Sequence, residues 1–318
     1  MIDVIGLGST FVDYFFKADE NFLKKYKLKP EDDFLFEERK IDPREILKEL
    51  QLVTKSIGGM STNTIKILSI LGISAGYYGV IGKNDEGNFW LKNINRINVS
   101  KIIQKGKMSI CYCILTDGGR KRLFLSKMNP RDTEFLKNID YNFLNKTKYI
   151  HITPFFTQNL SKIFIELEKI VKNLSLPIIS FTPGTTYINL GFKKILPVIK
   201  KTDILFLNSN EMRLLTGRNE KAGSNFLLKY KPKIVVCTMG EKGALITSKN
   251  DQFYIKAKKI KKVIDTTGAG DAFAAGFLYG LIKNKSLKWS ANFANKIASQ
   301  SVTDYGLNWL DGLKDKTV

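Results

Sequence analysis

The chain has 318 residues, of which 43% are hydrophobic and 25% charged, a balance typical of a globular protein. No apolar run approaches the roughly 20 residues that a membrane span needs, and the N-terminus lacks a basic stretch followed by an apolar core, so we expect a soluble, cytoplasmic protein. The net charge of +21 comes from scattered lysines and is dense only at residues 258–262, which is more typical of solvated faces than of a nucleic-acid-binding surface.

The first segment begins as a buried strand and ends in a turn of small residues. Gly6 and Gly8 match part of a dinucleotide-binding fingerprint, but the third glycine would fall at Phe11 and no clear helix follows, which excludes a dehydrogenase reading. Asp13 comes from the carboxyl end of this strand, where open α/β sheets bind ligands. The alternative for Asp13 is a solvated aspartate in a turn.

A change of composition over residues 15–50, where charged residues dominate, predicts an excursion from the sheet such as a lid. Gly58 and Gly59 then precede apolar residues at helical spacing, with Asn63 in the first turn of that helix. Backbone amides at the two glycines can approach a ligand hydroxyl, and Asn63 offers both a donor and an acceptor. A simple turn with a helix cap is the alternative.

Short apolar segments through the middle of the chain predict strands at residues 77–82, 149–153, 177–181, 204–208, 233–238 and 244–247, with a hairpin over 108–116 and 121–126. Amphipathic helices over residues 160–171 and 224–230 lie between strands, so we expect a mostly parallel sheet covered on both faces.

The cysteines predict no disulfide framework. Cys111 and Cys113 are two residues apart on one predicted strand, whose geometry opposes a bridge, and Cys237 is alone, so we expect all three to be reduced. His151 is the only histidine, which excludes a metal site built from several histidines.

Two further motifs follow late strands. Asn208 and Glu211 stand three residues apart at a helix start and can hold the water shell of Mg²⁺, or form only a helix cap. Thr238, Gly240 and Gly243 form a glycine turn suited to close approach of a nucleotide, or only a hairpin turn.

The segment before Asp271 carries the strongest chemical signal. Alternation over residues 256–264 predicts a strand, and small and apolar residues after Asp271 predict a closely packed helix. The amides of Gly268, Ala269 and Gly270 then form an anion site at the helix start. Because the Asp271 carboxylate would repel a bound phosphate, it favours a base beside a reacting phosphoryl group; a tight turn with an N-terminal charge is the alternative.

In order and spacing, these motifs resemble the ribokinase (PfkB-type) family of carbohydrate and nucleoside kinases over essentially the whole chain. The resemblance implies an α/β fold, a three-layer α/β/α sandwich with a mostly parallel central sheet and a small β-sheet lid. It implies one domain over residues 1–318, with the lid formed by about 13–56 and 106–126.

The family resemblance also implies a role for each motif. Asp271 would be the base that takes the acceptor's proton, and the amides of Gly268, Ala269 and Gly270 would form the anion hole. ATP would be the co-substrate. The acceptor hydroxyls would be bound by Asp13, Gly58, Gly59 and Asn63. The nucleotide would be bound by Asn208, Thr238, Gly240, Gly243 and Thr267. Asn208 and Glu211 would hold Mg²⁺ through water, and Asp265 and Thr267 would hold K⁺, as in some members of the family.

Within the family, residues 19–23, 28–30 and 155–157 are similar to adenosine kinases. This similarity implies that Phe156 stacks on a purine while Phe11 and Leu35 close the pocket, although core packing is the alternative for Phe156. Arg120 resembles a lid arginine of sugar kinases.

Two residues depart from the relatives, since Ser9 stands where adenosine kinases tend to have Asn and Thr182 where many relatives have Asp. We therefore expect a kinase acting on a nucleoside's primary hydroxyl, with a sugar kinase for ribose, fructose or 2-keto-3-deoxygluconate as the alternative. A non-catalytic nucleotide- or nucleic-acid-binding protein is the alternative from another class. A homodimer through the lid is a further expectation.

Overall fold

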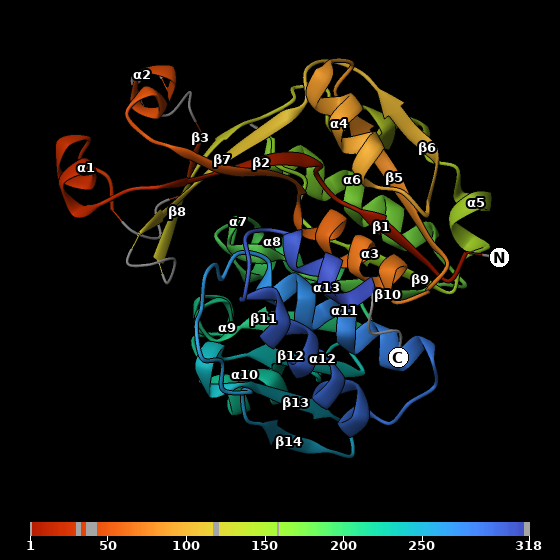
Figure 1. The fold of residues 1–318 in the computed structure, drawn as a ribbon. Helices are drawn as coiled ribbons and strands as arrows, with labels where there is room; N and C mark the ends of the chain where they lie inside the picture. The colour runs from red at the N-terminus through yellow and green to blue at the C-terminus, as the bar shows by residue number, and fades with distance from the viewer. Residues whose placement is uncertain (1, 30–32, 36–42, 117–120, 158, 315–318) are drawn as a thin grey trace.

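A nine-stranded sheet forms the centre of the structure, a computed structural model that describes residues 2–29, 33–35, 43–116, 121–157 and 159–314. The strand order is β14-β13-β12-β11-β10-β9-β1-β5-β6 (Figure 1). The pairs from β12 to β6 are parallel, and β13 and β14 extend the sheet antiparallel, which confirms the mostly parallel sheet. The strands are β1 (Val4–Leu7), β5 (Ala75–Ile81), β6 (Ile97–Gln104), β9 (Tyr149–Ile152), β10 (Ile178–Phe181), β11 (Ile204–Asn208), β12 (Ile234–Thr238), β13 (Ala244–Ser248) and β14 (Gln252–Ile255).

Helices cover both faces of this sheet and give it two separate hydrophobic cores. One core contains α3, α4, α11 and α12, and the other contains α6 to α10 (Figure 1). Strand residues alternate between them, as Val4 and Ile5 show. The helices are α3 (Met60–Ile70), α4 (Asp85–Asn93), α5 (Tyr141–Asn145), α6 (Leu160–Asn173), α7 (Gly184–Ile188), α8 (Phe192–Ile199), α9 (Ser209–Thr216), α10 (Glu220–Leu227), α11 (Ala269–Ile282), α12 (Leu287–Ser301) and α13 (Asp311–Lys314).

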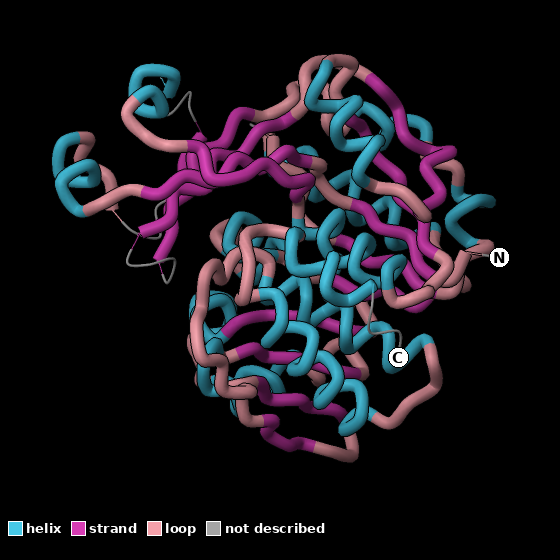
Figure 2. The backbone as a smooth tube through the Cα atoms, in the orientation of Figure 1, coloured by secondary structure: helices cyan, strands magenta, loops and turns pink. Residues whose placement is uncertain are grey.

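A second sheet of five strands, in the order β3-β8-β7-β2-β4, projects to one side of the main body (Figure 2). Its outer face packs on α1 and α2 through Phe22 and Ile46, and its other face carries Phe15, which packs against Tyr305 near the end of the chain. The predicted small β-sheet is therefore confirmed. Its elements are β2 (Phe11–Lys17), α1 (Glu20–Lys25), β3 (Asp33–Leu35), α2 (Pro43–Lys48), β4 (Leu52–Gly58), β7 (Ser109–Thr116) and β8 (Lys121–Lys127).

Three details of the sequence-based prediction are wrong. No strand forms over residues 256–264, because Asn295 of α12 bonds the carbonyl of Lys256 and the amide of Lys258, and Ile264 N–H donates to Val302 O. These side-chain and loop partners replace a strand ladder. The helix predicted over residues 224–230 is α10, which begins at Glu220 and ends at Leu227. Strands β6 and β14 were not predicted.

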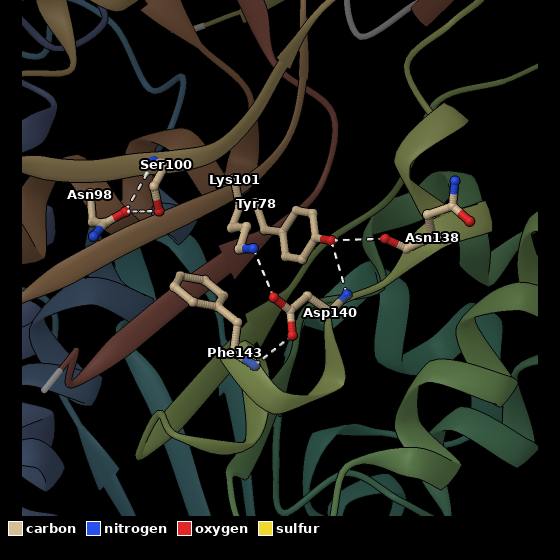
Figure 3. Close-up of polar contacts among 7 residues, drawn as sticks. All are labelled: Tyr78, Asn98, Ser100, Lys101, Asn138, Asp140 and Phe143. Atoms are coloured by element: carbon tan, nitrogen blue, oxygen red, sulfur yellow. Dashed lines mark hydrogen bonds and ion pairs between the residues drawn. The ribbon is translucent and has the colours of Figure 1, made fainter.

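Edge strand β6 is held by polar contacts with the segment before β9 (Figure 3). Lys101 donates to Asp140 at 2.7 Å, and the other oxygen of Asp140 caps α5 by accepting from Phe143 N–H. Tyr78 donates to Asn138 O and accepts from Asp140 N–H, both at 3.1 Å. This network fastens the sheet edge that lies farthest in strand order from β14.

None of the described helices has the length and apolar character needed to cross a membrane.

The close contact between α11 and α12 depends on a glycine, which has no side chain to keep the two helices apart. A Cβ added at Gly276 would lie 2.6 Å from Ala294 Cα and 3.1 Å from Ala294 N, which are backbone atoms and cannot move independently. Small residues therefore let the helix that follows the glycine turn pack directly on its neighbour.

We predict that Gly276→Ala lowers the free energy of unfolding by about 1–3 kcal/mol, because the new methyl overpacks two helix backbones. The control is Gly312→Ala in α13, where an added Cβ meets nothing within 4 Å. Both changes gain helix propensity, so urea denaturation of the pair isolates the packing effect. Equal stability of the two variants would contradict this account of the contact.

Candidate active site

Asp265 fixes the shape of the loop that leads into α11. Its side chain is fully buried, and its two oxygens accept from Thr267 N–H at 2.8 Å and from Gly306 N–H at 3.1 Å. Gly268 follows with φ of +74°, a left-handed conformation that glycine adopts without a Cβ penalty, and caps the helix. The amides of Ala269 and Gly270 thus begin α11 as the sequence predicted.

Asp271 lies in the first turn of α11 and is only 8% exposed. Asn63 of α3 donates to Asp271 Oδ2 at 2.9 Å, and Thr64 Oγ1 donates to the Asp271 carbonyl at 3.3 Å. Burial raises the pKa of Asp271 to about 7, and the negative charge of Glu211 adds to this, while the Asn63 bond and the positive charge of Arg122 oppose it. The carboxyl therefore titrates in the range that a general base needs near neutral pH.

Asp13 belongs to β2 of the small sheet, not to a loop after β1 as the sequence suggested. A Cβ at Gly58 would overlap the Asp13 carboxylate, so Gly58 makes room for it. Burial, together with the charges of Asp265 and Asp271, raises the pKa of Asp13 to about 8. Asp13 of the small sheet thus lies within electrostatic reach of both Asp265, in the loop before α11, and Asp271, in α11.

Gly59 turns the chain from β4 into α3. Its φ is +101°, and a Cβ there would overlap the carbonyl oxygen of Ser9. Across the first turn of α3, Asn63 N–H donates to Gly59 O at 2.9 Å. Gly59 is therefore required by the backbone and Gly58 by the Asp13 carboxylate, and the turn brings Asn63 to Asp271.

Arg122 of β8 reaches the glycine loop from the small sheet and was missed by the sequence analysis. Its Nη1 donates to Thr266 Oγ1, and its Nε is buried without a hydrogen-bond partner in the described part of the chain. Its charge lowers the pKa of Asp271 and of Asp265. Arg120, the lid arginine chosen from sequence, lies outside the described residues.

Phe156 is half-buried after β9, and its ring meets Phe11 edge-on, with centroids 5.5 Å apart and planes at 85°. Phe155 is fully buried and packs on Phe135, so core packing explains Phe155, whereas Phe156 keeps part of its side chain exposed. Leu35 ends β3, and its side chain lies outside the part of the chain that the structure describes.

Asp132 is a further buried carboxylate, and through Ser9 it fixes the backbone beside Phe156. Ser9 Oγ donates to Asp132 and accepts from Phe156 N–H at 2.8 Å. Burial raises the pKa of Asp132 to about 7. Ser9 precedes β2 and Asp132 follows β8, so the pair joins two of the chain crossings between the sheets. Sequence reasoning noted Ser9 only as a departure and missed Asp132.

Asn208 and Glu211 form a reciprocal capping box at the start of α9. Glu211 N–H donates to Asn208 Oδ1 at 2.8 Å, and Asn208 N–H donates to Glu211 Oε2 at 2.9 Å. Glu211 is 6% exposed, burial raises its pKa, and Oε1 lies 3.5 Å from Thr185 Oγ1. The cap reading is therefore confirmed, and the remaining oxygen lone pairs fit a hard cation that keeps its waters.

Thr238 lies opposite Asn208 at the carboxyl ends of neighbouring parallel strands β11 and β12. The turn that follows contains a 3₁₀ helix, Gly240–Lys242, with Gly240 at φ +57° and facing open space. At Gly243, with φ +102°, a Cβ would overlap Ile255 O. Backbone packing alone thus requires Gly243, whereas Gly240 leaves room above the turn.

Thr267 Oγ1 is buried, and although it lies close enough to the Asp265 carboxylate to lower the pKa of that group, no contact to it in the described part of the chain has hydrogen-bond geometry. Both oxygens of neighbouring Asp265 accept backbone N–H groups but keep lone pairs. The orphaned hydroxyl and this carboxylate fit an additional ligand, either a phosphate oxygen or a monovalent cation such as K⁺.

Known proteins are similar to this chain in sequence and in fold. An uncharacterised sugar kinase of Archaeoglobus fulgidus is 30% identical over 75% of this chain and 95% of its own length. A nucleoside kinase of Methanocaldococcus jannaschii is 28% identical over 80% of this chain and 82% of its own length.

The solved structure of an adenosine kinase from Sinorhizobium meliloti superposes with a TM-score of 0.84 at 18% identity, over 100% of this chain and 99% of that one. Residues 31–309 match the pfkB family of carbohydrate kinases. On this match, which contains the glycine loop and every strand of the two sheets except β1 and β2, the chain belongs to the pfkB family and is a kinase.

Proposed function

We propose that this kinase transfers the γ-phosphoryl group of ATP to the primary hydroxyl of a nucleoside. The observation that carries the proposal is the buried Asp271 carboxylate at the start of α11, held by Asn63 and placed beside the glycine amides. A base next to an anion site suits a reaction in which a hydroxyl loses its proton while negative charge develops on phosphate oxygens.

In the proposed reaction the acceptor O–H proton passes to a carboxylate oxygen of Asp271. The hydroxyl oxygen bonds to the γ-phosphorus as the bond from that phosphorus to the bridging oxygen of ADP breaks. The amides of Gly268, Ala269 and Gly270 stabilise the equatorial oxygens, and Arg122 adds a positive charge from the small sheet.

The nucleotide would lie along the carboxyl ends of β11 and β12, on Asn208, Thr238, the Gly240 to Gly243 turn and Thr267. Mg²⁺, when bound, neutralises phosphate charge; Asn208 and Glu211 would hold it through water. The electrostatic contact between Glu211 and Asp271 supports one continuous site from nucleotide to acceptor. K⁺ at Asp265 and Thr267 is part of the same proposal.

For the acceptor, the half-buried Phe156 and the edge-on Phe11 offer a platform of the kind that stacks on a base. Asp13 would accept hydrogen bonds from ribose hydroxyls, and the small sheet that carries it would act as a lid. A free sugar is the second candidate, since Asp13 serves any polyol and one similar relative is called a sugar kinase. The homodimer through the small sheet stays a prediction; β4 forms one edge of that sheet.

We predict that Asp271→Asn lowers kcat by about 10²–10⁴-fold, because the base is lost, while nucleotide binding persists. Asp251→Asn, on the exposed turn between β13 and β14, is the matched control and keeps normal turnover. A coupled ADP-release assay with a separate nucleotide-binding titration measures both effects. Near-normal turnover of Asp271→Asn would show that another group acts as the base.

The pKa of Asp271 predicts a pH dependence with a definite sign. Because the folded-state pKa is raised to about 7, ionised base is lost and kcat/KM falls as pH drops below about 7. The same shift disfavours the folded state at higher pH, so Asp271→Asn melts above the wild type at pH 8, and this gap closes as pH approaches 4. Equal melting curves at pH 8, with a flat rate profile from pH 5 to 8, would contradict a buried titrating base.

An acceptor panel tests the nucleoside assignment. We expect turnover of nucleosides, with Phe156→Ala raising the nucleoside KM about tenfold through lost stacking while any ribose KM stays unchanged. Tyr254→Ala, which removes a 58% exposed aromatic from β14, serves as control. Turnover of only ribose, fructose or 2-keto-3-deoxygluconate would refute the nucleoside proposal and leave the kinase chemistry in place.

A further inference from the structure

Asp13 lies beside two thiols that the proposed reaction does not use. Strands β2 and β7 run parallel in a register that places Asp13 opposite Cys111 and Phe15 opposite Cys113. Since side chains two residues apart share one face of a strand, both thiols lie on the same face as Asp13. The carboxylate oxygen and both sulfurs lie within 4.8 Å of one another.

The spacing of the two sulfurs is that of a metal-binding pair. Cys111 Sγ and Cys113 Sγ are 3.7 Å apart and form no disulfide. In a tetrahedral zinc site with Zn–S bonds of about 2.3 Å, two thiolates are separated by about 3.8 Å. Asp13 needs a shift of about 1 Å or less to complete a set of two sulfurs and one oxygen with bond lengths in the usual range.

The surroundings favour a positive ion at this place. Asp13 is within electrostatic reach of the Asp265 and Asp271 carboxylates, and burial opposes the ionised form of all three. Bound Zn²⁺ would favour the ionised form of these carboxyls, because its positive charge offsets the negative charge that burial opposes. Thiolate ligands select a thiophilic ion over Mg²⁺ or Ca²⁺, which prefer oxygen.

We propose that Asp13, Cys111 and Cys113 form a binding site for a thiophilic divalent cation of the Zn²⁺ class, with a fourth position open to water. Binding releases the two thiol protons and, below about pH 8, the proton of the Asp13 carboxyl to solvent, because thiolates and a carboxylate are the ligands. The cation takes Asp13 away from the acceptor, so the site is inhibitory. This inhibitory consequence rests on the proposed acceptor role of Asp13, whereas the metal site itself does not.

Cobalt binding tests the site without any turnover. Co²⁺ titrated into the reduced full-length protein, without nucleotide, gives sulfur-to-cobalt charge transfer and the visible bands of tetrahedral cobalt, and one equivalent of Zn²⁺ removes both. Cys111→Ser and Cys113→Ala each weaken the apparent affinity at least about tenfold, since even loss of an outer-shell partner costs 10–100-fold. Cys237→Ala, which removes a buried thiol of β12, keeps the wild-type spectrum.

Absence of sulfur-to-cobalt charge transfer in the wild type, or unchanged affinity in Cys111→Ser, overturns the site. Cys113 is only 1% exposed, so Cys113→Ala could fail to fold; Cys111, which is half-buried, then decides the question alone. Asp13→Asn provides the third ligand test, with weaker binding but retained charge transfer from the two sulfurs.

Kinetics then test the inhibitory role. Zn²⁺ raises the acceptor KM without changing the KM for ATP, and Cys111→Ser, normalised to its own zinc-free rate, is inhibited at least about tenfold less. Zinc binding that leaves the acceptor KM unchanged overturns the inhibitory role. A cobalt spectrum together with no nucleoside turnover refutes the nucleoside proposal and supports the metal site, so the two failures are distinguishable.

Discussion

The burial of three carboxylates at one place is the constraint on which this structure depends. Asp13, Asp265 and Asp271 are each at most 8% exposed, and the charges of Asp265 and Asp271 raise the pKa of Asp13. Buried charges require partners, and here the partners come from every part of the chain. Asn63 donates to Asp271 across 208 residues of sequence, and backbone amides occupy both oxygens of Asp265. The fold is thus organised to place acids where water is scarce.

The small sheet contributes to this balance as directly as the main body does. It brings one more negative charge through Asp13 and one positive charge through Arg122, whose guanidinium bonds Thr266 in the glycine loop. The position of the sheet therefore contributes to the electrostatics of the loop. The Ser9 and Asp132 contact lies where the chain enters and leaves this sheet, so it couples the sheet's position to the backbone of Phe156.

How much was predictable depended on whether a feature is local in sequence. The glycine loop and its helix followed from spacing alone, because positive φ at Gly268 and close packing at Gly276 are backbone requirements. Arg122, Asp132 and the thiols beside Asp13 depend on the register of β2, β7 and β8, which no local pattern specifies. The false strand at 256–264 had the right alternation, but side-chain amide contacts from Asn295 satisfied its backbone instead.

The carboxylates to which we assign the chemistry also weaken the fold near neutral pH. A folded-state pKa above the unfolded value means that the folded protein binds more protons between the two, so stability falls as pH rises through that window. For Asp271 the window runs from 3.8 to about 7, and for Asp13 it extends to about 8. A ligand that hydrogen-bonds or neutralises these groups relieves the penalty, and relief is largest where the acids are most crowded. Acceptor and thiophilic cation would therefore compete for one source of binding free energy, the Asp13 carboxylate.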